Sequence, residues 1–280
     1  MAIDLLAIKP HKVSRDLSGY ITYIYGPGGA GKTTFGAATP KPLLLAFEKG
    51  YNALPGVIAQ DITTWGELKQ VLRELKKPEV KAAFSTIIID TVDIASQLCE
   101  KYLCNQLGIE NIGDGGWATN GWAKVKKEWE QTFRAVTMEG YALVFISHSK
   151  DKTFKPKNAP EYNQIVPSCS TAYNEIIKNM ADIMGYIQLY GKDRVICFDP
   201  TETYQAKNSC NLPGVSKIPL LVDEKGNATG KNNFFENVIN TFIANQQAKV
   251  AKRQEYDELI ETIGGAINDS TTLDELNELC

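Results

Sequence analysis

Short apolar runs and stretches of helical periodicity alternate along the first 150 residues of the chain. Apolar, β-branched or aromatic residues fill positions 20–25, 43–47, 86–89 and 141–146. Runs of this length are typical of strands that are buried on both faces of a parallel sheet. Apolar residues recur at helical spacing in segments 65–77, 91–107 and 122–139. The alternation predicts an α/β fold in which helices cover a mainly parallel central sheet.

Several residues mark where these elements begin and end. Thr64 and Glu67 form a T-x-x-E capping box at the start of one helix, and Pro78 is expected to close that helix. Gly140 suits the position that follows the helix ending near residue 139. A further short strand is expected in 56–62, and a glycine-rich loop is expected in 108–121.

The pattern changes after residue 149. Residues 149–170 have the character of a long polar loop that carries four lysines. Segments 183–190 and 194–198 predict a β-hairpin across residues 191–193. Residues 201–216 then form a turn-rich return.

The C-terminal segment from residue 232 onward has helical spacing of apolar residues. Helices are expected in 232–252 and 255–267, with a break at 268–269 and a last helix opened by a capping box at Thr272 and Glu275. The domains expected are an N-terminal lead-in of residues 1–19, a core of residues 20–244 and a C-terminal helical appendage of residues 245–280.

A glycine-rich stretch follows the first strand. Residues 26–33 fit G-x-x-x-x-G-K-[ST], the phosphate-binding P-loop, with a strand before it and a helix after it. Glycines let backbone N–H groups point at phosphate oxygens, and the start of the helix near Gly31 favours negative charge. Lys32 can reach the β- and γ-phosphates, and Thr33 can place its hydroxyl on Mg²⁺. The residues expected to hold ATP are Gly26, Pro27, Gly28, Gly29, Ala30, Gly31, Lys32, Thr33 and Thr34.

Two acidic residues follow predicted strands. Asp90 ends the run STIIID in the Walker B arrangement, where an acid holds Mg²⁺ through its water shell, although an acid here can also cap the next helix. AAA+ motors carry a glutamate after this acid, whereas this chain has Thr91. Glu48 follows the LLLAF strand, and the carboxyl ends of strands converge on the ligand crevice of an α/β sheet. Glu48 is therefore the candidate that deprotonates water, the alternative being a solvated residue paired with Lys49.

Ser147 and His148 come at the end of another buried strand, in VFISHSK. Hydrogen bonds from this pair could sense the γ-phosphate. A lone histidine is also often structural, so both interpretations stand at this point.

Taken together, these residues resemble the RecA/RadA ATPase core. The shared features are the P-loop, the acid in FEKG, a Walker B acid without a following Glu, and a strand that ends in Ser-His. The resemblance runs from Gly19 to Val215 and is closest to short phage-encoded RecA-like proteins with an AAA-type domain, some of which act in single-strand annealing. It implies a RecA-like P-loop NTPase core with a mainly parallel central sheet, a C-terminal β-hairpin and a helical appendage.

The resemblance also implies roles for individual residues. Residues 149–170 would contact DNA, with Phe154 or Tyr162 either stacking on bases or packing within the loop. Lys207 would reach the γ-phosphate of a neighbouring subunit, while Ser209 stands where many relatives have an Arg, which argues against fast hydrolysis. The DNA-binding residues expected are Lys150, Lys152, Lys155 and Lys157. The catalytic residues expected are Glu48, Lys32, Asp90, His148 and Lys207, and the Mg²⁺ ligands are Thr33 and, through water, Asp90.

Charge and cysteine content limit the partners, metal sites and cellular compartment that we expect for the protein. The 280 residues carry a net charge of −3, so nucleic acid would have to meet a local basic patch. The six cysteines have no C-x-x-C pair and no zinc-finger spacing to a histidine, which predicts reduced thiols and no zinc site. We find no signal peptide and no membrane-spanning stretch, and we expect a cytoplasmic protein, of a host bacterium if a phage encodes it, with no membrane partner.

The resulting hypothesis is a Mg-ATP-dependent ATPase that binds single-stranded DNA and promotes annealing or homologous recombination in phage DNA metabolism. The resemblance implies a homo-oligomer, a ring or filament with ATP at subunit interfaces, and a single-strand-binding protein as a further partner. One alternative is a small-molecule P-loop kinase, which needs an Arg-rich lid, whereas this chain has few arginines: Arg15, Arg73, Arg134, Arg194 and Arg253. The other alternative is a slowly hydrolysing, ATP-gated DNA-binding scaffold, which Ser209 favours.

Overall fold

The computed structural model describes residues 18–52, 54, 56–114, 116–157, 160–191, 193–219 and 234–269. The chain divides into a unit of Ser14–Ile239 and a second unit that includes the described residues from Asn240 onward. Most of the expected lead-in and the helix expected at Thr272 lie outside the described residues.

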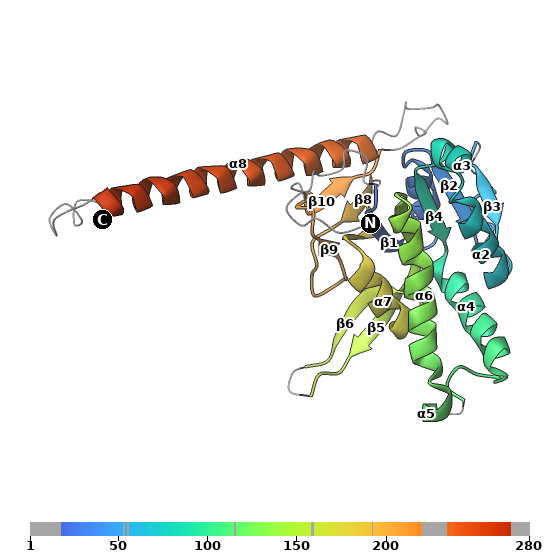
Figure 1. Cartoon of the computed structure of the whole chain (residues 1–280). Coiled ribbons are helices and arrows are strands. Elements are labelled where there is room, and N and C mark those ends of the chain that lie inside the picture. The colour runs from blue at the N-terminus through green and yellow to red at the C-terminus, as the bar shows by residue number, and fades with distance from the viewer. Residues whose placement is uncertain are drawn as a thin grey trace. The chain divides into compact units, whose positions relative to one another are not determined.

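One ten-stranded sheet runs through the unit of Ser14–Ile239, in the order β10-β8-β7-β1-β5-β4-β2-β3, with β6 on β5 and β9 on β7. Its strands are β1 (Ile21–Gly26), β2 (Pro42–Ala46), β3 (Ala59–Asp61), β4 (Thr86–Asp90), β5 (Ala142–Phe154), β6 (Tyr162–Pro167), β7 (Ile183–Tyr190), β8 (Asp193–Cys197), β9 (Lys207–Asn208) and β10 (Val215–Lys217). The pairs from β7 through β1, β5, β4 and β2 to β3 are parallel. The predicted α/β fold with a mainly parallel central sheet is therefore confirmed (Figure 1).

The helices match the predicted periodic segments closely. They are α1 (Lys32–Ala37), α2 (Trp65–Glu74), α3 (Pro78–Ala83), α4 (Val92–Leu107), α5 (Gly116–Thr119), α6 (Gly121–Met138), α7 (Thr171–Met180) and α8 (Phe234–Asp269). The capping box is confirmed, because the Thr64 hydroxyl accepts the Glu67 N–H at 3.1 Å and the Glu67 carboxylate accepts the Thr64 N–H at 3.2 Å. Pro78 opens the short helix α3 as well as following α2, since a proline without an N–H fits the first turn of a helix.

An aromatic cluster fastens α2, α6 and α7 to one face of the sheet. Trp129 of α6 lies 5.6 Å from Trp65 of α2, 4.8 Å from Tyr173 of α7 and 6.3 Å from Phe145 of β5, measured between ring centroids. All four side chains are fully buried. Burial of several large rings at one place holds the strand ends beneath it in fixed positions.

The polar loop predicted for 149–170 is wrong as a loop. Strand β5 continues beyond His148, where its pairing with β1 ends, and residues 149–154 form an antiparallel hairpin with β6. Both faces of this hairpin carry polar side chains, so its sequence shows no alternation of apolar and polar residues. Periodicity alone cannot detect such a strand.

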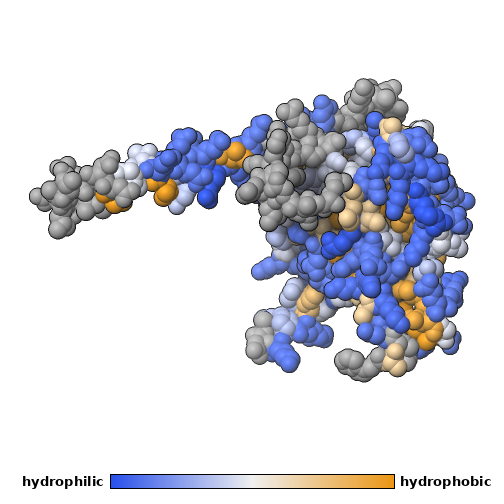
Figure 2. All heavy atoms as spheres, in the orientation of Figure 1, coloured by the Kyte–Doolittle hydropathy of each residue, from blue (hydrophilic) through white to orange (hydrophobic). Residues whose placement is uncertain are grey.

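The C-terminal helical segment is also more continuous than predicted. A single helix, α8, runs through the gap expected between residues 252 and 255 and ends at Asp269, within the break expected at 268–269. Apolar side chains interrupt its otherwise hydrophilic surface (Figure 2), among them Tyr256, Leu259, Ile260, Ile263 and Ile267, which are each 40% exposed or more.

Candidate functional site

The P-loop joins β1 to α1 and is shaped by glycines. Gly29 and Gly31 have φ angles of 74° and 84°, in a region that favours glycine. A Cβ atom on Gly26 would lie 2.3 Å from the carbonyl oxygen of Ile187 in β7, so only glycine fits there. The loop therefore rests on the strand beside β1, and the predicted strand–loop–helix arrangement is confirmed.

Lys32 turns its side chain back into this loop. Its ammonium donates to the carbonyl oxygens of Gly26 at 3.0 Å and Pro27 at 2.9 Å. Burial lowers the pKa of Lys32, although the carboxylates of Asp90 and Glu48 oppose that shift. A buried ammonium whose close hydrogen-bond partners are neutral carbonyl groups can bind an anion that enters the loop.

Thr33 and Asp90 meet where a phosphate-bound cation would lie. The Thr33 hydroxyl donates to Asp90 Oδ2 at 2.6 Å, and the Asp90 residue is only 3% exposed. Burial raises the pKa of Asp90, and the Thr33 hydrogen bond partly offsets this effect. A hydroxyl and a desolvated carboxyl at the P-loop are oxygen donors of the kind that Mg²⁺ takes, so these residues fit the expected ion. The peptide bond between Asp90 and Thr91 is cis.

Glu48 and His148 complete a chain of contacts that begins at Lys32. His148 Nε2 lies 3.1 Å from Glu48 Oε1, and His148 Nδ1 lies 3.5 Å from the Lys32 ammonium. An ammonium can only donate a hydrogen bond, so His148 Nδ1 accepts from Lys32. The N–H at His148 Nε2 then donates a hydrogen bond to Glu48. The backbone of Glu48 is tied to the Walker B strand, because the Asp90 carbonyl accepts the N–H of Phe47 at 2.7 Å and that of Glu48 at 3.4 Å. The structure therefore brings together the strand ends that the sequence pointed to.

Asp93, in the first turn of α4, belongs to this constellation but was not predicted. One carboxylate oxygen accepts the His148 backbone N–H at 3.3 Å, and the other accepts the Ser168 hydroxyl. The Ser168 N–H in turn donates to the His148 carbonyl at 2.8 Å. An acid three residues after the Walker B position is the only sequence signal that could have indicated this contact.

The four lysines expected to bind DNA lie on or beside the β5–β6 hairpin, with different surroundings. Lys150 donates to the carbonyl oxygens of Ser168 at 2.9 Å and Cys169 at 3.2 Å. Lys152 donates to the Thr171 hydroxyl and lies 5.0 Å from the ring centroid of Phe154. Lys155 pairs with Glu161 at 2.9 Å, and Lys157 is exposed. Lys155 and Lys157 are thus exposed on the hairpin, Lys152 is half-buried, and Lys150 is exposed while bonded to carbonyl groups at the hairpin's base.

Phe154 and Tyr162 form a pair on the same hairpin. They face each other in register, with ring centroids 5.2 Å apart and an angle of 12° between the ring planes. Tyr162 is 44% exposed. The predicted alternatives of base stacking and packing within the segment both fit this geometry, because the rings stack on each other while Tyr162 remains partly exposed.

Lys207 lies in β9, on the other side of β1 from Glu48. Its ammonium donates to the carbonyl oxygens of Lys178 and Ala181, at the C-terminal end of α7. A lysine at this position stabilises the free carbonyl groups and the negative end of the helix dipole. Its action on a neighbouring subunit stays a prediction that requires these bonds to be released.

Arg194 is a second residue that the sequence did not single out. A Cβ atom placed on Gly31 would lie 3.2 Å from Arg194 Nη1 and 3.5 Å from Arg194 Cζ. A guanidinium from β8 therefore lies against the P-loop, although it belongs to the sheet and not to a lid.

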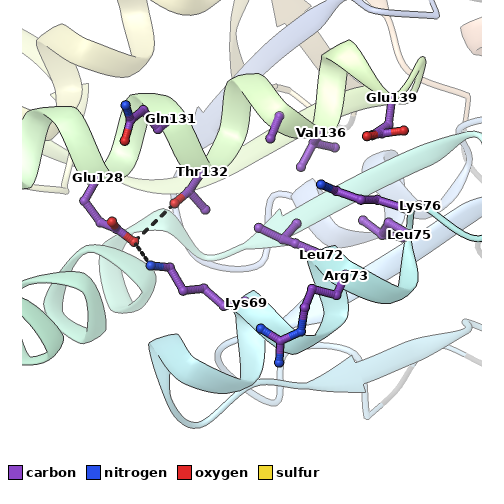
Figure 3. Close-up of a pocket in the computed structure, with 11 residues that line it drawn as sticks. Lys69, Leu72, Arg73, Leu75, Lys76, Glu128, Gln131, Thr132, Val136 and Glu139 are labelled. Atoms are coloured by element: carbon purple, nitrogen blue, oxygen red, sulfur yellow. Dashed lines mark hydrogen bonds and ion pairs between the residues drawn. The ribbon is translucent and has the colours of Figure 1, made fainter.

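A pocket of about 310 Å³ lies between α2 and α6. Figure 3 shows Glu128 of α6 directed toward Lys69 of α2, and this pair is 2.7 Å apart. Glu128 also accepts the indole N–H of Trp65 at 2.8 Å. The lining includes no residue of the P-loop or of Glu48, Asp90 and His148, so this pocket does not provide a substrate site beside the phosphates.

The described residues contain no group of three or more His, Cys, Asp or Glu residues that could hold a metal ion. Among the helices of these segments, none has the length and apolar content needed to cross a membrane.

The chain is similar to known proteins over most of its length. The SPbeta prophage-derived uncharacterized protein YorG of Bacillus subtilis (strain 168) is 30% identical over 300 aligned positions, which cover 100% of this chain and 89% of that protein. The crystal structure of the RadB recombinase aligns with a TM-score of 0.42 and 14% identity, over 75% of this chain and 90% of that chain, which is too distant to carry a statement about activity. The family described as AAA domain matches residues 18–210, the segment that holds the P-loop, Glu48, Asp90 and His148. The chain therefore belongs to this AAA domain family of P-loop proteins.

Proposed function

We propose that this protein is a Mg-ATP-dependent ATPase with a RecA-like core that binds single-stranded DNA and promotes annealing or homologous recombination in phage DNA metabolism. The observation that carries the proposal is the convergence of Lys32, Glu48, His148 and Asp90 at one P-loop. Membership of the AAA domain family supports nucleotide binding, and the prophage-derived relative supports a phage origin.

Glu48 is the proposed base for hydrolysis. His148 donates to Oε1 of this carboxylate, while Oε2 accepts no hydrogen bond within the described part of the chain. Oε2 can therefore orient a water molecule and take its proton. When bound, Mg²⁺ would neutralise charge on the β- and γ-phosphates, and Thr33 and Asp90 are the residues that would hold it.

His148 is proposed to report the state of the γ-phosphate to the β5–β6 hairpin. Its imidazole contacts Glu48 and Lys32, and its backbone contacts Asp93 and Ser168 at the base of the hairpin. A second connection starts from Tyr25 of β1, whose hydroxyl donates toward the carbonyl oxygens of Ile165 at 3.1 Å and Gln205 at 2.7 Å. Contacts of this kind support a switch in which nucleotide binding changes the order of a DNA-contacting segment.

The hairpin is the proposed DNA-binding element. Lys150, Lys152, Lys155 and Lys157 supply positive charge on a protein whose net charge is −3, and Phe154 and Tyr162 supply a stacking surface. Lysines attract the phosphate backbone, and aromatic rings stack on bases without strong sequence preference.

A homo-oligomer with ATP at its interfaces, in which Lys207 acts on the neighbouring site, remains part of the proposal. Lys207 would leave the end of α7 when the neighbouring subunit offers a γ-phosphate. Ser209 in place of an arginine supports slow hydrolysis, so an ATP-gated DNA-binding scaffold is the second candidate function.

The deciding experiment measures ATP hydrolysis with and without single-stranded DNA. We expect DNA to raise the rate several-fold, and Lys32→Ala to lower it by roughly 10²-fold or more, because the transferring phosphate loses its cation. Lys124→Ala, which removes an exposed lysine from α6, is the matched control and should leave the rate unchanged. Absence of a DNA effect, together with elution as a monomer in the presence of ATP, would contradict the recombination proposal. Annealing that proceeds equally well with a non-hydrolysable ATP analogue would favour the scaffold.

A further inference from the structure

The guanidinium of Arg194 lies against the P-loop from the side opposite to Glu48 and His148. Glu48 follows β2, Asp90 ends β4 and His148 lies within β5. These three strands are all on one side of β1 in the sheet. Arg194 belongs to β8, which is reached from β1 through β7 on the other side. The two groups of residues therefore approach the phosphate-binding loop from opposite directions.

The register of the hairpin directs Arg194 toward the loop. Leu189 of β7 is paired with Arg194, and directly opposite residues of an antiparallel pair share a face of the sheet. Leu189 lies two residues after Ile187, so it shares that residue's face as well. The side chain of Ile187 lies 3.5 Å from the Cβ position of Gly26, which places this face against the loop.

Arg194 has no competing anion among the described residues. No ion pair in this part of the chain involves its guanidinium, and the side chain is only partly buried. The neighbouring cation Lys217 is different, because it is paired with Asp193 at 2.7 Å and lies opposite Val195, on the other face of the sheet. A guanidinium that is positioned by packing but has no anionic partner is suited to bind the oxygens of a phosphate group.

We infer that Arg194 binds the α- and β-phosphates of the nucleotide, the diphosphate part that ATP and ADP share. The inference rests on the proposed binding of nucleotide at the P-loop and specifies which part of that nucleotide Arg194 contacts. In the proposed function the γ-phosphate would face Glu48 and His148, so a cation from the opposite side would meet the end of the triphosphate that remains after hydrolysis. Arg194 therefore retains the product as firmly as the substrate.

The test compares the affinities for Mg-ADP and for a non-hydrolysable Mg-ATP analogue by titration calorimetry. Arg194→Ala is expected to raise both dissociation constants by roughly 10- to 100-fold, the usual effect of losing charge-assisted hydrogen bonds. Arg194→Lys, which keeps the charge and the packing stem but loses the planar fork, is expected to raise both by about 3- to 10-fold. Lys217→Ala serves as the control and should change neither constant.

Several outcomes would overturn the inference. An unchanged dissociation constant for ADP in both Arg194 variants would do so, and so would a loss confined to the ATP analogue, which would move the contact to the γ-phosphate. A lower Tm of the nucleotide-free protein with unchanged affinity would give Arg194 a packing role only. If the unaltered protein binds neither nucleotide, the proposed function fails as well, whereas normal binding with no Arg194 effect overturns this inference alone.

Discussion

Glu48 accepts a hydrogen bond from His148 and has a second carboxylate oxygen available, and this arrangement predicts the effect of removing its charge. Glu48→Gln should keep the dissociation constant for ATP within about threefold, because the amide retains an oxygen that can accept from Nε2. The rate of hydrolysis should fall by about 10²- to 10⁴-fold, the range for loss of a general base. Nucleotide binding by fluorescence and phosphate release in single-turnover assays measure the two effects. A normal rate in this variant would show that Glu48 is not the base for hydrolysis. Lys49→Ala tests the alternative in which Glu48 is paired with Lys49.

The buried carboxyl of Asp90 is expected to lower the stability of the protein, although the proposed activity requires it. Because burial raises its pKa, the folded protein retains this proton to a higher pH than the unfolded chain does. The free energy of unfolding therefore falls as the pH rises from the unfolded-state pKa through the folded-state pKa. At neutral pH the protein still bears this loss of stability, because the buried carboxylate is then charged. Asp90→Asn should raise the Tm of the nucleotide-free protein at pH 7 by about 2–4 °C, the shift that roughly 1 kcal/mol gives in a domain of this size. The difference in Tm between Asp90→Asn and the unaltered protein should shrink toward acidic pH. Mg-ATP should no longer raise the Tm of the variant.

Thermal unfolding at several pH values, with and without Mg-ATP, provides the measurement. A variant that is less stable than the unaltered protein at pH 7 would show that the Thr33–Asp90 hydrogen bond outweighs the cost of burying the charge. Thr33→Ser keeps the hydroxyl and serves as the control.

The residues recognised from the sequence are those whose signal is local. Lys32 and Thr33 lie within one contiguous motif, and Asp90 and Glu48 directly follow apolar runs that mark strand ends. Arg194 is brought to Gly31 only by the pairing of β8 with β7 and of β7 with β1, which no short stretch of sequence encodes. Asp93 likewise acquires its partners from β5 and from the segment after β6.

The same distinction holds at the scale of elements. Buried strands and amphipathic helices were predicted within a few residues, and the capping box at Thr64 was exact in position. The β5–β6 hairpin was missed because solvent reaches both of its faces, so no apolar pattern is required to form it. Its strands are instead held by cross-strand pairs such as Phe154 with Tyr162.

This hairpin carries a prediction about DNA. Phe154→Ala and Tyr162→Ala should each weaken binding of single-stranded DNA by about 5- to 100-fold, the effect of losing one stacked base, with little change in salt dependence. Lys157→Ala should reduce the slope of log affinity against log salt by about 0.7, since one phosphate contact is lost. Fluorescence anisotropy of a labelled oligonucleotide at several salt concentrations distinguishes the two effects. Equal affinities for the aromatic variants and for Lys124→Ala would assign the ring pair to packing alone.

At the scale of the whole molecule, the question is whether Lys207 acts within its own chain or on a neighbour. A Lys207→Ala subunit keeps its P-loop but lacks the proposed finger, whereas a Lys32→Ala subunit keeps Lys207 but cannot hydrolyse ATP. A mixture of the two should therefore hydrolyse ATP faster than the sum of the separate proteins, because some interfaces combine both intact parts. Steady-state ATPase assays over a range of mixing ratios provide the measurement.

If the mixture shows only the sum of the separate activities, Lys207 serves the end of α7 in its own chain. Lys178→Ala is a suitable control. The backbone carbonyl of residue 178, and not its side chain, accepts the hydrogen bond from the Lys207 ammonium, so the substitution leaves this contact in place. That variant should leave both hydrolysis and complementation intact.

Asp93 has a consequence for how such proteins can diversify. One carboxylate fixes both the departure of the chain at His148 and its return at Ser168, so the hairpin begins and ends at a single anchored point. A segment with this attachment can be exchanged for another hairpin while its attachment point stays the same. Its length and sequence can vary, by natural drift or by grafting in the laboratory, while the phosphate-handling half of the molecule stays the same. If the hairpin binds DNA as proposed, new binding preferences can thus arise there without changes at the P-loop.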